Sequence, residues 1–400
     1  MKKFAVIILL GILGLIFIAA VPASASLFKN KACNSEKYLS TGDKEIKKEF
    51  KVNSGGKVTI DLKTGADIEI KGWNKDLLSV VASIEDDKDN PIEFEFNQSG
   101  NNVEITSKYT HKNKHNHSSA KLTLQVPQKY NIDFTTMGGD VDIKSVEGEL
   151  EGKTMGGALI LSNLKGNLNL TTMGGEISLK NSEVDGSVKT MGGEVLVENV
   201  KGDVNASSMG GKVRQINVEG KNKSIGKEVN ISTMGGELEI DKAPNGAKLR
   251  TMGGDINVNS VGKFLDAETM GGNIEAKEVD GWIKAKTMGG DVNVKMVGNP
   301  KDGNRDVKLT SMGGDITLVV PSGLSMEIDV EIAYTKNSHK NFEDCKIVSD
   351  FKIDEQRTTE WERKNGNSER KYVYGKGSVD GGKNKILIKT INGNVYLKKS

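Results

Sequence analysis

The residues whose chemistry could bind a ligand stand in a four-residue motif, T-M-G-G, that first occurs in TTMGGD at residues 135–140. Its ten methionines are Met137, Met155, Met173, Met191, Met209, Met234, Met252, Met270, Met288 and Met312. Thioethers are soft ligands that favour Cu(I), and the Thr or Ser before each methionine could form a hydroxyl array of the ice-binding kind. Charged residues beside the hydroxyls argue against such an array, and packing of identical side chains explains a methionine column without a metal. We therefore expect no metal at the motif.

The residue that follows each Gly-Gly pair is usually acidic. The acids are Asp140, Glu176, Glu194, Glu237, Asp255, Asp291 and Asp315, and Ala158, Lys212 and Asn273 interrupt them. Stacked carboxylates could attract cations. An acid beside a turn also commonly accepts backbone N–H groups, and we favour this structural role.

Three histidines, His111, His115 and His117, form the one other cluster with ligand potential. The stretch is polar and basic and holds no Cys or acid, so it predicts a solvated hairpin loop rather than a metal site. We recognise no Ser-His-Asp order, phosphate-binding loop or paired-carboxylate cleft in the sequence. The sequence therefore predicts no catalytic residue, no cofactor and no metal, and hence no enzyme.

The spacing of the motif predicts the elements that carry it. Successive methionines are 18 residues apart, except for gaps of 25 after Met209 and 24 after Met288, which we assign to loops that leave a coil and return to it. Between motifs, apolar residues alternate in short pairs such as Val195 and Val197, which is typical of strands. Such strands bury a core only when stacked, so we predict an all-β parallel β-solenoid with 18-residue coils that rise about 4.8 Å each.

The motif itself predicts a corner of each coil. Thr136 has the parity of the preceding Phe134, whereas Met137 has the parity of the following Val141. The residues that point inward therefore change from even to odd numbers at the motif. Glycine suits such a bulge. Because burying a methionine stabilises by about 1.5–3 kcal/mol, we expect Met inward and Thr outward. In the first four copies these structural residues are Met137, Gly138, Gly139, Met155, Gly156, Gly157, Met173, Gly174, Gly175, Met191, Gly192 and Gly193.

The N-terminus has the layout of a secretory signal peptide over residues 1–25, with Lys2 and Lys3, an apolar run from Phe4 to Val21, and the small-residue pattern Ala23-Ser24-Ala25. The run is also long enough for an uncleaved membrane anchor. Removing residues 1–25 lowers the formal charge from +2 to 0. A neutral chain argues against nucleic acid or an acidic membrane surface as the main partner. We expect an exported protein that is periplasmic, on the cell surface or secreted, with membrane contact only through an uncleaved N-terminus.

The two cysteines, Cys33 and Cys345, could form a disulfide in an exported protein. They could equally be free or paired between molecules, because sequence alone does not fix connectivity.

The parts of the chain follow from these patterns. We expect a linker over residues 26–49, an N-terminal β-rich cap over 50–130, the ten-repeat solenoid over 131–320, and a C-terminal β-rich cap over 321–400 with a charged excursion at 354–371. Near the C-terminus, residues 390–395 repeat the motif with Ile391 in the methionine position. Terminal coils are atypical because they cap the core and block strand pairing between molecules.

The chain resembles a bacterial family described as putative adhesins of unknown function, whose repeats read roughly T-x-x-G-D-I-x-V. The resemblance rests on residues 55–73, the step Leu122 to Pro127, the ten motifs and the ending Lys383 to Leu397. It implies a β-solenoid at the bacterial envelope and supplies no catalytic residues. Unlike the family pattern, this chain has a uniform Met-Gly-Gly and a long array.

We therefore expect a non-enzymatic structural or adhesive surface protein whose partner is a surface polymer or an envelope protein. One alternative is a scaffold that self-associates through its coil ends. Another is a polysaccharide-acting β-helix enzyme, which the low aromatic content of 5% disfavours.

Overall fold

The computed structural model describes residues 34–39, 44–85, 91–110, 119–220, 228–338, 340–363 and 369–400. All of them belong to one compact unit, Cys33–Ser400. Within these residues the protein consists of strands and a single short 3-10 turn, η1 (Phe342–Asp344). The prediction of an all-β protein with a large, mostly parallel, solenoid-like sheet is confirmed.

The strands form two stacks, here called sheet I and sheet II. Sheet I contains, in order of pairing, β2 (Lys44–Lys51), β5 (Leu77–Glu85), β8 (Ser119–Pro127), β4 (Asp67–Trp73), β10 (Val141–Lys144), β12 (Leu159–Ser162), the first part of β14 (Ile177–Thr190), β15 (Val195–Lys201), β17 (Val213–Glu219), β19 (Leu238–Ala243), the first parts of β21 (Ile256–Glu268) and β22 (Ile274–Lys286), β23 (Val292–Met296), β25 (Ile316–Val320), β31 (Val395–Lys399) and β27 (Ile347–Ser349).

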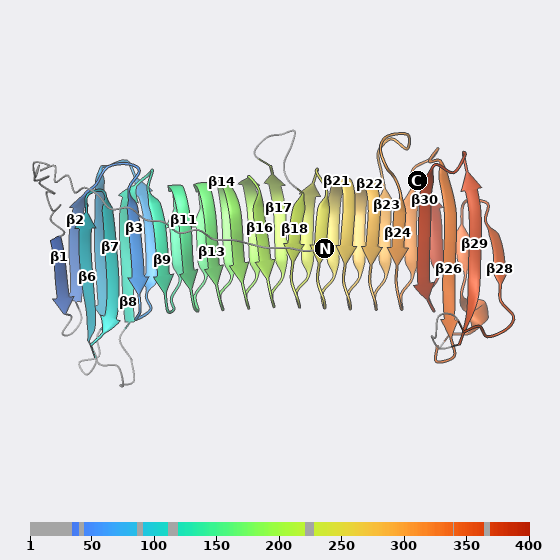
Figure 1. Cartoon of the computed structure of the whole chain (residues 1–400), viewed down its shortest axis with the longest axis horizontal. Helices are drawn as coiled ribbons and strands as arrows, with labels where there is room; N and C mark the ends of the chain where they lie inside the picture. Colours follow the sequence, from blue (N-terminus) through green and yellow to red (C-terminus); the bar gives the residue numbers. More distant parts are fainter. Residues whose placement is uncertain are drawn as a thin grey trace, which may run out of the picture. The chain divides into compact units, whose positions relative to one another are not determined.

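Sheet II contains β1 (Asn34–Leu39), β6 (Ile92–Ser99), β7 (Asn102–Tyr109), β3 (Lys57–Leu62), β9 (Asn131–Thr136), β11 (Glu147–Thr154), β13 (Lys165–Thr172), the second part of β14, β16 (Val204–Ser208), β18 (Val229–Ser232), β20 (Ala247–Arg250), the second parts of β21 and β22, β24 (Val307–Thr310), β30 (Asn384–Ile391), β26 (Met326–Thr335), β29 (Arg370–Val379) and β28 (Asp354–Arg357). The strands succeed one another along the unit from β1 at one end to β28 at the other (Figure 1).

The core lies between the two sheets and is built from columns of small aliphatic side chains. In one column of sheet I, Val141 pairs with Leu159, Leu159 with Ile177, and Ile177 with Val195. All four side chains are buried. Alternation along each strand sends every second residue inward, and parallel register places each inward residue on its counterpart in the next coil. Each such burial stabilises the fold by about 1.5–3 kcal/mol.

The motif corner has the opposite orientation to the one we expected. Thr136, Thr154, Thr172, Thr190, Thr233, Thr251, Thr269 and Thr287 are buried, as are Ser208 and Ser311, whereas nine of the ten methionines are exposed. Met137 is 56% exposed and Met155, the least exposed of the nine, 38%. The prediction that Met points inward and Thr outward was wrong.

The hydroxyl explains why the buried position takes Thr. The Thr172 hydroxyl donates to the carbonyl of Gly157 in the preceding coil at 2.7 Å and accepts the N–H of Gly175 at 3.3 Å. The same pair of bonds recurs in every motif from Thr172 to Ser311, so each of these hydroxyls satisfies two backbone groups that would otherwise be buried without partners. Thr is therefore the last inward-pointing residue of the preceding strand, and Met-Gly-Gly forms an outward turn before the next strand.

Replacing one of the buried motif threonines tests whether its hydroxyl bonds stabilise the corner. The Thr251 hydroxyl donates to Gly236 at 2.9 Å and accepts the N–H of Gly254 at 3.3 Å. We expect Thr251→Val, which keeps the shape, to lower the free energy of unfolding by about 2 kcal/mol, because two buried backbone groups lose their partner. Thr251→Ser should cost only about 0.8 kcal/mol for the lost methyl group. Urea unfolding followed by circular dichroism measures both variants. Equal losses of unfolding free energy in the two variants would contradict the role of the hydroxyl.

Where the residue after Gly-Gly is Asp, its carboxylate accepts a backbone N–H group, as we expected. An Asp140 carboxylate oxygen accepts the N–H of Ala158 at 2.7 Å, and Asp255 accepts that of Asn273 at 2.6 Å. Asp291 similarly accepts the N–H of Asp315 at 2.7 Å. Each carboxylate thus caps the next coil, and this prediction is confirmed for these residues.

The opposite corner of the coil carries an asparagine column that the sequence analysis overlooked. Asn163, Asn181, Asn199 and Asn217 all have φ between 50° and 54°. Asparagine tolerates this left-handed conformation better than most residues. The side chains also hydrogen-bond between coils, with Asn217 Nδ2 donating to Asn199 Oδ1 at 2.7 Å. The column fixes the bend between sheet I and sheet II.

The pairing changes from parallel to antiparallel at the first end of both sheets and at the last end of sheet II, whereas β27 still pairs parallel with β31 at the last end of sheet I. At the first end, β5 pairs antiparallel with β8 and β2, and β6 with β7 and β1. At the other, β26 pairs antiparallel with β29, and β29 with β28. Residues 26–49, for which we expected a linker, therefore contribute β1 and β2 to the first cap. The physical reason is that Ile46 and Phe50 share one face of the lysine-rich strand β2 and pack on the core, as does Val52 just after the strand.

The C-terminal cap holds Cys345, whose side chain is buried. Burial raises the pKa of its thiol, so the unreactive protonated form is favoured. The charged excursion includes the exposed edge strand β28, which pairs with β29. Residues 364–368 of the excursion lie outside the described part of the chain.

Several predictions concern residues outside the described ranges: the signal peptide or anchor at 1–25, Cys33 as a disulfide partner of Cys345, and the histidines His111, His115 and His117. Within the described ranges, the structure contains no helix long and apolar enough to cross a membrane.

Candidate functional site

The outward face of sheet II near the C-terminal cap combines aromatic and charged side chains. In β21 and β22, Leu265 and Ile283 point into the core, and so the neighbouring Phe264 and Trp282 point out. These two residues pair across the parallel ladder. Their rings stack with centroids 4.9 Å apart and planes 11° from parallel. The result is a half-buried aromatic pair on an otherwise polar face.

The aromatic pair is supported from one side by a glycine. Gly246 lies beneath the Phe264 ring, so that a Cβ at this position would meet Phe264 Cε1 at 2.2 Å. The ring of Phe264 therefore occupies space that a side chain at Gly246 would fill. On the other side of Trp282 lie Lys308 of the next strand, β24, and Asp306 just before that strand.

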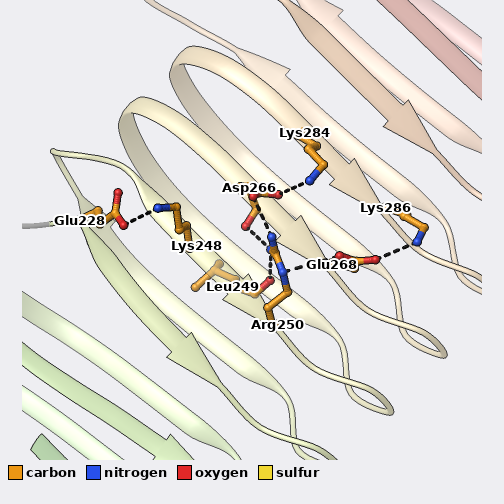
Figure 2. A network of polar contacts seen from close by, with 8 residues as sticks. All are labelled: Glu228, Lys248, Leu249, Arg250, Asp266, Glu268, Lys284 and Lys286. Atoms are coloured by element: carbon orange, nitrogen blue, oxygen red, sulfur yellow. Dashed lines mark hydrogen bonds and ion pairs between the residues drawn. The ribbon is translucent and has the colours of Figure 1, made fainter. Parts of the chain in front are cut away.

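A network of ion pairs continues this face toward the motif corner (Figure 2). Arg250 Nη2 lies 2.7 Å from Asp266 Oδ2, and Arg250 Nε lies 3.6 Å from Glu268 Oε2. Lys284 and Lys286 from β22 extend the chain of contacts, to Asp266 at 3.4 Å and to Glu268 at 2.8 Å. Opposite charges in neighbouring coils are thus paired along this face.

The carboxylate of Glu268 titrates as part of this network. Its hydrogen bond to Lys286, together with the charges of Lys286, Arg250 and Lys284, holds the pKa of Glu268 below its ordinary value. A lowered folded-state pKa adds stability above the unfolded-state pKa, and that stability is lost as the pH falls through the folded-state value. The network is therefore intact at neutral pH.

A shallow groove of about 580 Å³ lies beside Trp282. Its charged lining residues are the lysines Lys284, Lys308 and Lys385 and the acids Asp306, Glu327 and Asp329. Three positive and three negative side chains give the groove no net charge. Asn304 and Leu387 complete the outward lining. The groove therefore offers an aromatic edge and many hydrogen-bonding groups without favouring either sign of ligand charge.

One wall of the groove belongs to the insert loop at residues 297–306, which a buried arginine holds in place. Arg305 donates to Val297 O at 2.6 Å and to Asp302 O at 3.0 Å, and its guanidinium forms an ion pair with Asp280 at 2.5 Å. These bonds fix the loop from inside. The neighbours Asn304 and Asp306 consequently reach the groove from a fixed backbone.

None of the residues predicted from the sequence belongs to this site. The motif residues Met137, Gly138, Gly139 and their counterparts lie at the corners and do not line the groove. Among the described residues there is no group of three or more His, Cys, Asp or Glu side chains arranged to hold a metal ion. A signal was available, since Phe264 and Trp282 occupy the same outward column of adjacent repeats.

The fold and the groove together define a class: a non-globular β-solenoid with a capped core and a neutral surface groove. The chain belongs to the Toastrack DUF4097 family, whose model matches residues 56–398. This match confirms the family resemblance inferred from the repeats. No protein of curated function matches the chain.

Solved structures that are similar to this chain include three of low sequence identity. They are a putative cell adhesion protein from Clostridium sporogenes (7% identity, TM-score 0.16, covering 92% of this chain and 100% of that one), a putative lipid binding protein from Parabacteroides distasonis (18%, 0.29, 64% and 97%) and a putative adhesin from Bacteroides fragilis (16%, 0.29, 64% and 99%).

Proposed function

We propose that this protein is a non-enzymatic, exported surface rod that binds a neutral glycan in the groove beside Trp282. The observation that carries the proposal is the half-buried Phe264–Trp282 stack at the edge of a groove with balanced charges.

The chemistry of the groove favours a sugar. The indole of Trp282 stacks nearly parallel on the ring of Phe264. An apolar ring face of this kind suits the C–H face of a pyranose ring. The lysine and carboxylate groups around it are suited to hydroxyl groups, which both donate and accept. Because the charges cancel, neither a polyanion nor a polycation gains a net electrostatic attraction.

The exposed acids support binding rather than catalysis. A carboxylic acid that protonates a glycosidic oxygen at neutral pH needs a raised pKa, which burial in an apolar pocket provides. Asp306, Glu327 and Asp329 are exposed in the groove. They are suited to accept hydrogen bonds from a bound sugar without acting as a general acid.

A binding experiment with defined polysaccharides tests the proposal. Affinity electrophoresis through dextran, mannan and laminarin should retard the purified mature chain in at least one gel, whereas heparin and chitosan should not. Trp282→Ala should weaken the retarding interaction about 30-fold, which corresponds to the loss of about 2 kcal/mol typical of a tryptophan anchor. Trp282→Phe should retain part of the binding.

The matched control is Tyr396→Ala. Tyr396 is also half-buried and points outward, but it lies in β31 of sheet I. This variant should bind like the parent chain. Binding that is lost equally in both variants, or absent from all three neutral polysaccharides, would contradict the groove, and release of reducing sugar would contradict the non-enzymatic proposal.

A scaffold that polymerises through its coil ends has less physical support. The edge strand β28 is exposed along its whole length with the sequence DEQR, and β2 at the other end carries four lysines and two glutamates. Charged edge strands disfavour pairing between sheets. Light scattering of the mature chain should therefore give a monomer.

A further inference from the structure

The methionine column forms a continuous exposed surface feature that neither the fold nor the proposed glycan groove uses. The chain has 13 methionines, and ten of them occupy the same position of successive motifs. Nine of these ten are between 38% and 56% exposed, and Met173 is partly buried. By contrast, Met296 and Met326, which lie outside the motif, are buried in the core.

Core packing does not explain the column, because the side chains are outside the core. The backbone does not demand methionine either, since Ile391 occupies the equivalent position of the terminal coil. A turn exposed to solvent ordinarily takes polar residues. What methionine adds to an aliphatic side chain at this position is its thioether sulfur.

Backbone hydrogen bonds fix the spacing of the column in its central part. The Met234 N–H donates to Met209 O at 3.0 Å, and the Met252 N–H donates to Met234 O at 3.1 Å. The Met270 N–H donates to Met252 O and the Met288 N–H to Met270 O, both at 3.2 Å. Consecutive methionines are therefore about one strand spacing, 4.8 Å, apart and start from equivalent backbone positions. Flexible side chains at this spacing can bring two or three sulfurs to one ion.

The neighbouring groups favour a soft ion over a hard one. Thioethers select Cu(I), whereas Mg²⁺ and Ca²⁺ require oxygen ligands. The nearest file of acids contains Asp140, Asp255 and Asp291, whose carboxylates accept backbone N–H groups of the next coil. We infer that the methionine column from Met137 to Met312 is a multisite binding surface for Cu(I), held by two or three thioethers per ion.

Metal binding by the mature chain tests this inference directly. Anaerobic titration with Cu(I) against the competing chelator bicinchoninate should show about three to five ions per chain, the number that ten thioethers can hold in twos or threes. X-ray absorption should show sulfur as the main ligand. Stoichiometry below one ion per chain would overturn the inference.

A set of variants distinguishes the column from other sites. Replacing Met209, Met234, Met252, Met270 and Met288 together with Leu should remove about half of the bound Cu(I) and leave the circular dichroism spectrum unchanged. Met296→Leu and Met326→Leu, which alter buried methionines, should leave the stoichiometry unchanged. Unchanged binding in the fivefold variant would overturn the proposal.

Oxidation of the folded parent chain provides a readout that does not depend on how a variant folds. Hydrogen peroxide transfers one oxygen to each exposed thioether and leaves water, which gives methionine sulfoxide. Peroxide treatment should add oxygen to the column methionines before Met296 and Met326 and abolish Cu(I) binding while the strand signal is retained. Full Cu(I) binding by the oxidised chain would contradict the role of the sulfurs.

Discussion

Gly157→Ala should lower the free energy of unfolding by about 3 kcal/mol, because the second glycine of the motif leaves no room for a side chain. A Cβ at Gly157 would lie 2.0 Å from Gly139 O and 2.2 Å from Gly139 C of the preceding coil. Both atoms are backbone, so no change of rotamer relieves the clash. The backbone at Gly157 is not left-handed, and the requirement is therefore steric rather than conformational.

The first glycine of the same motif supplies the control. A Cβ at Gly156 would have only Gly138 Cα within 4 Å, at 3.8 Å. Gly156→Ala should therefore change the free energy of unfolding by less than about 0.5 kcal/mol, as is usual for a surface substitution. Urea unfolding measures both variants, and hydrogen exchange should locate the loss of protection in Gly157→Ala at the coils next to residue 157. Similar losses in the two variants would show that close contact between the corners is not what requires glycine.

Deleting residues 172–189 should leave a folded chain that is one coil shorter. In the parent, Leu159 pairs with Ile177 and Ile177 with Val195. After the deletion Val195 can pair with Leu159 directly, since inward residues remain inward. Each coil contacts only its neighbours in a solenoid, so the loss of one coil removes local contacts without disturbing distant ones. We expect the same strand signal per residue and a shorter particle in small-angle X-ray scattering.

Deleting residues 172–180 is the matched contrast. This change removes Thr172, the Met-Gly-Gly turn and the sheet I part of β14 with its buried Ile177 and Leu179. The neighbouring coils then lose both the inward side chains and the strand that pairs with β12 and β15, which should cost more than about 5 kcal/mol, a large share of the stability of a typical domain. We expect aggregation or loss of the strand signal. If both deletions fold equally well, the coil length of 18 residues is incorrect.

The sequence was informative about the repeat because periodicity depends on few physical rules. Alternating pairs such as Val195 and Val197 are buried as expected, and the strand ladder continues past both inserts, since Val213 pairs with Leu238 and Val292 with Ile316. The candidate site was less accessible to prediction. Phe264 and Trp282 share a column in sequence, but the groove beside them also needs Glu327 and Lys385, which only the pairing of β26, β30 and β24 brings there.

The sequence by itself determined the all-β class, the stacking of short strands, the inward aliphatic columns and the family, because each follows from local alternation repeated along the chain. Only the tertiary structure decided which face of the TMGG corner is buried. Parity alone allowed either Thr or Met to point inward, and the apolar character of methionine favoured the wrong one. The deciding interaction is between coils: the buried hydroxyl of Thr172 bonds to the carbonyl of Gly157, and that bond exists only once one coil lies on the next.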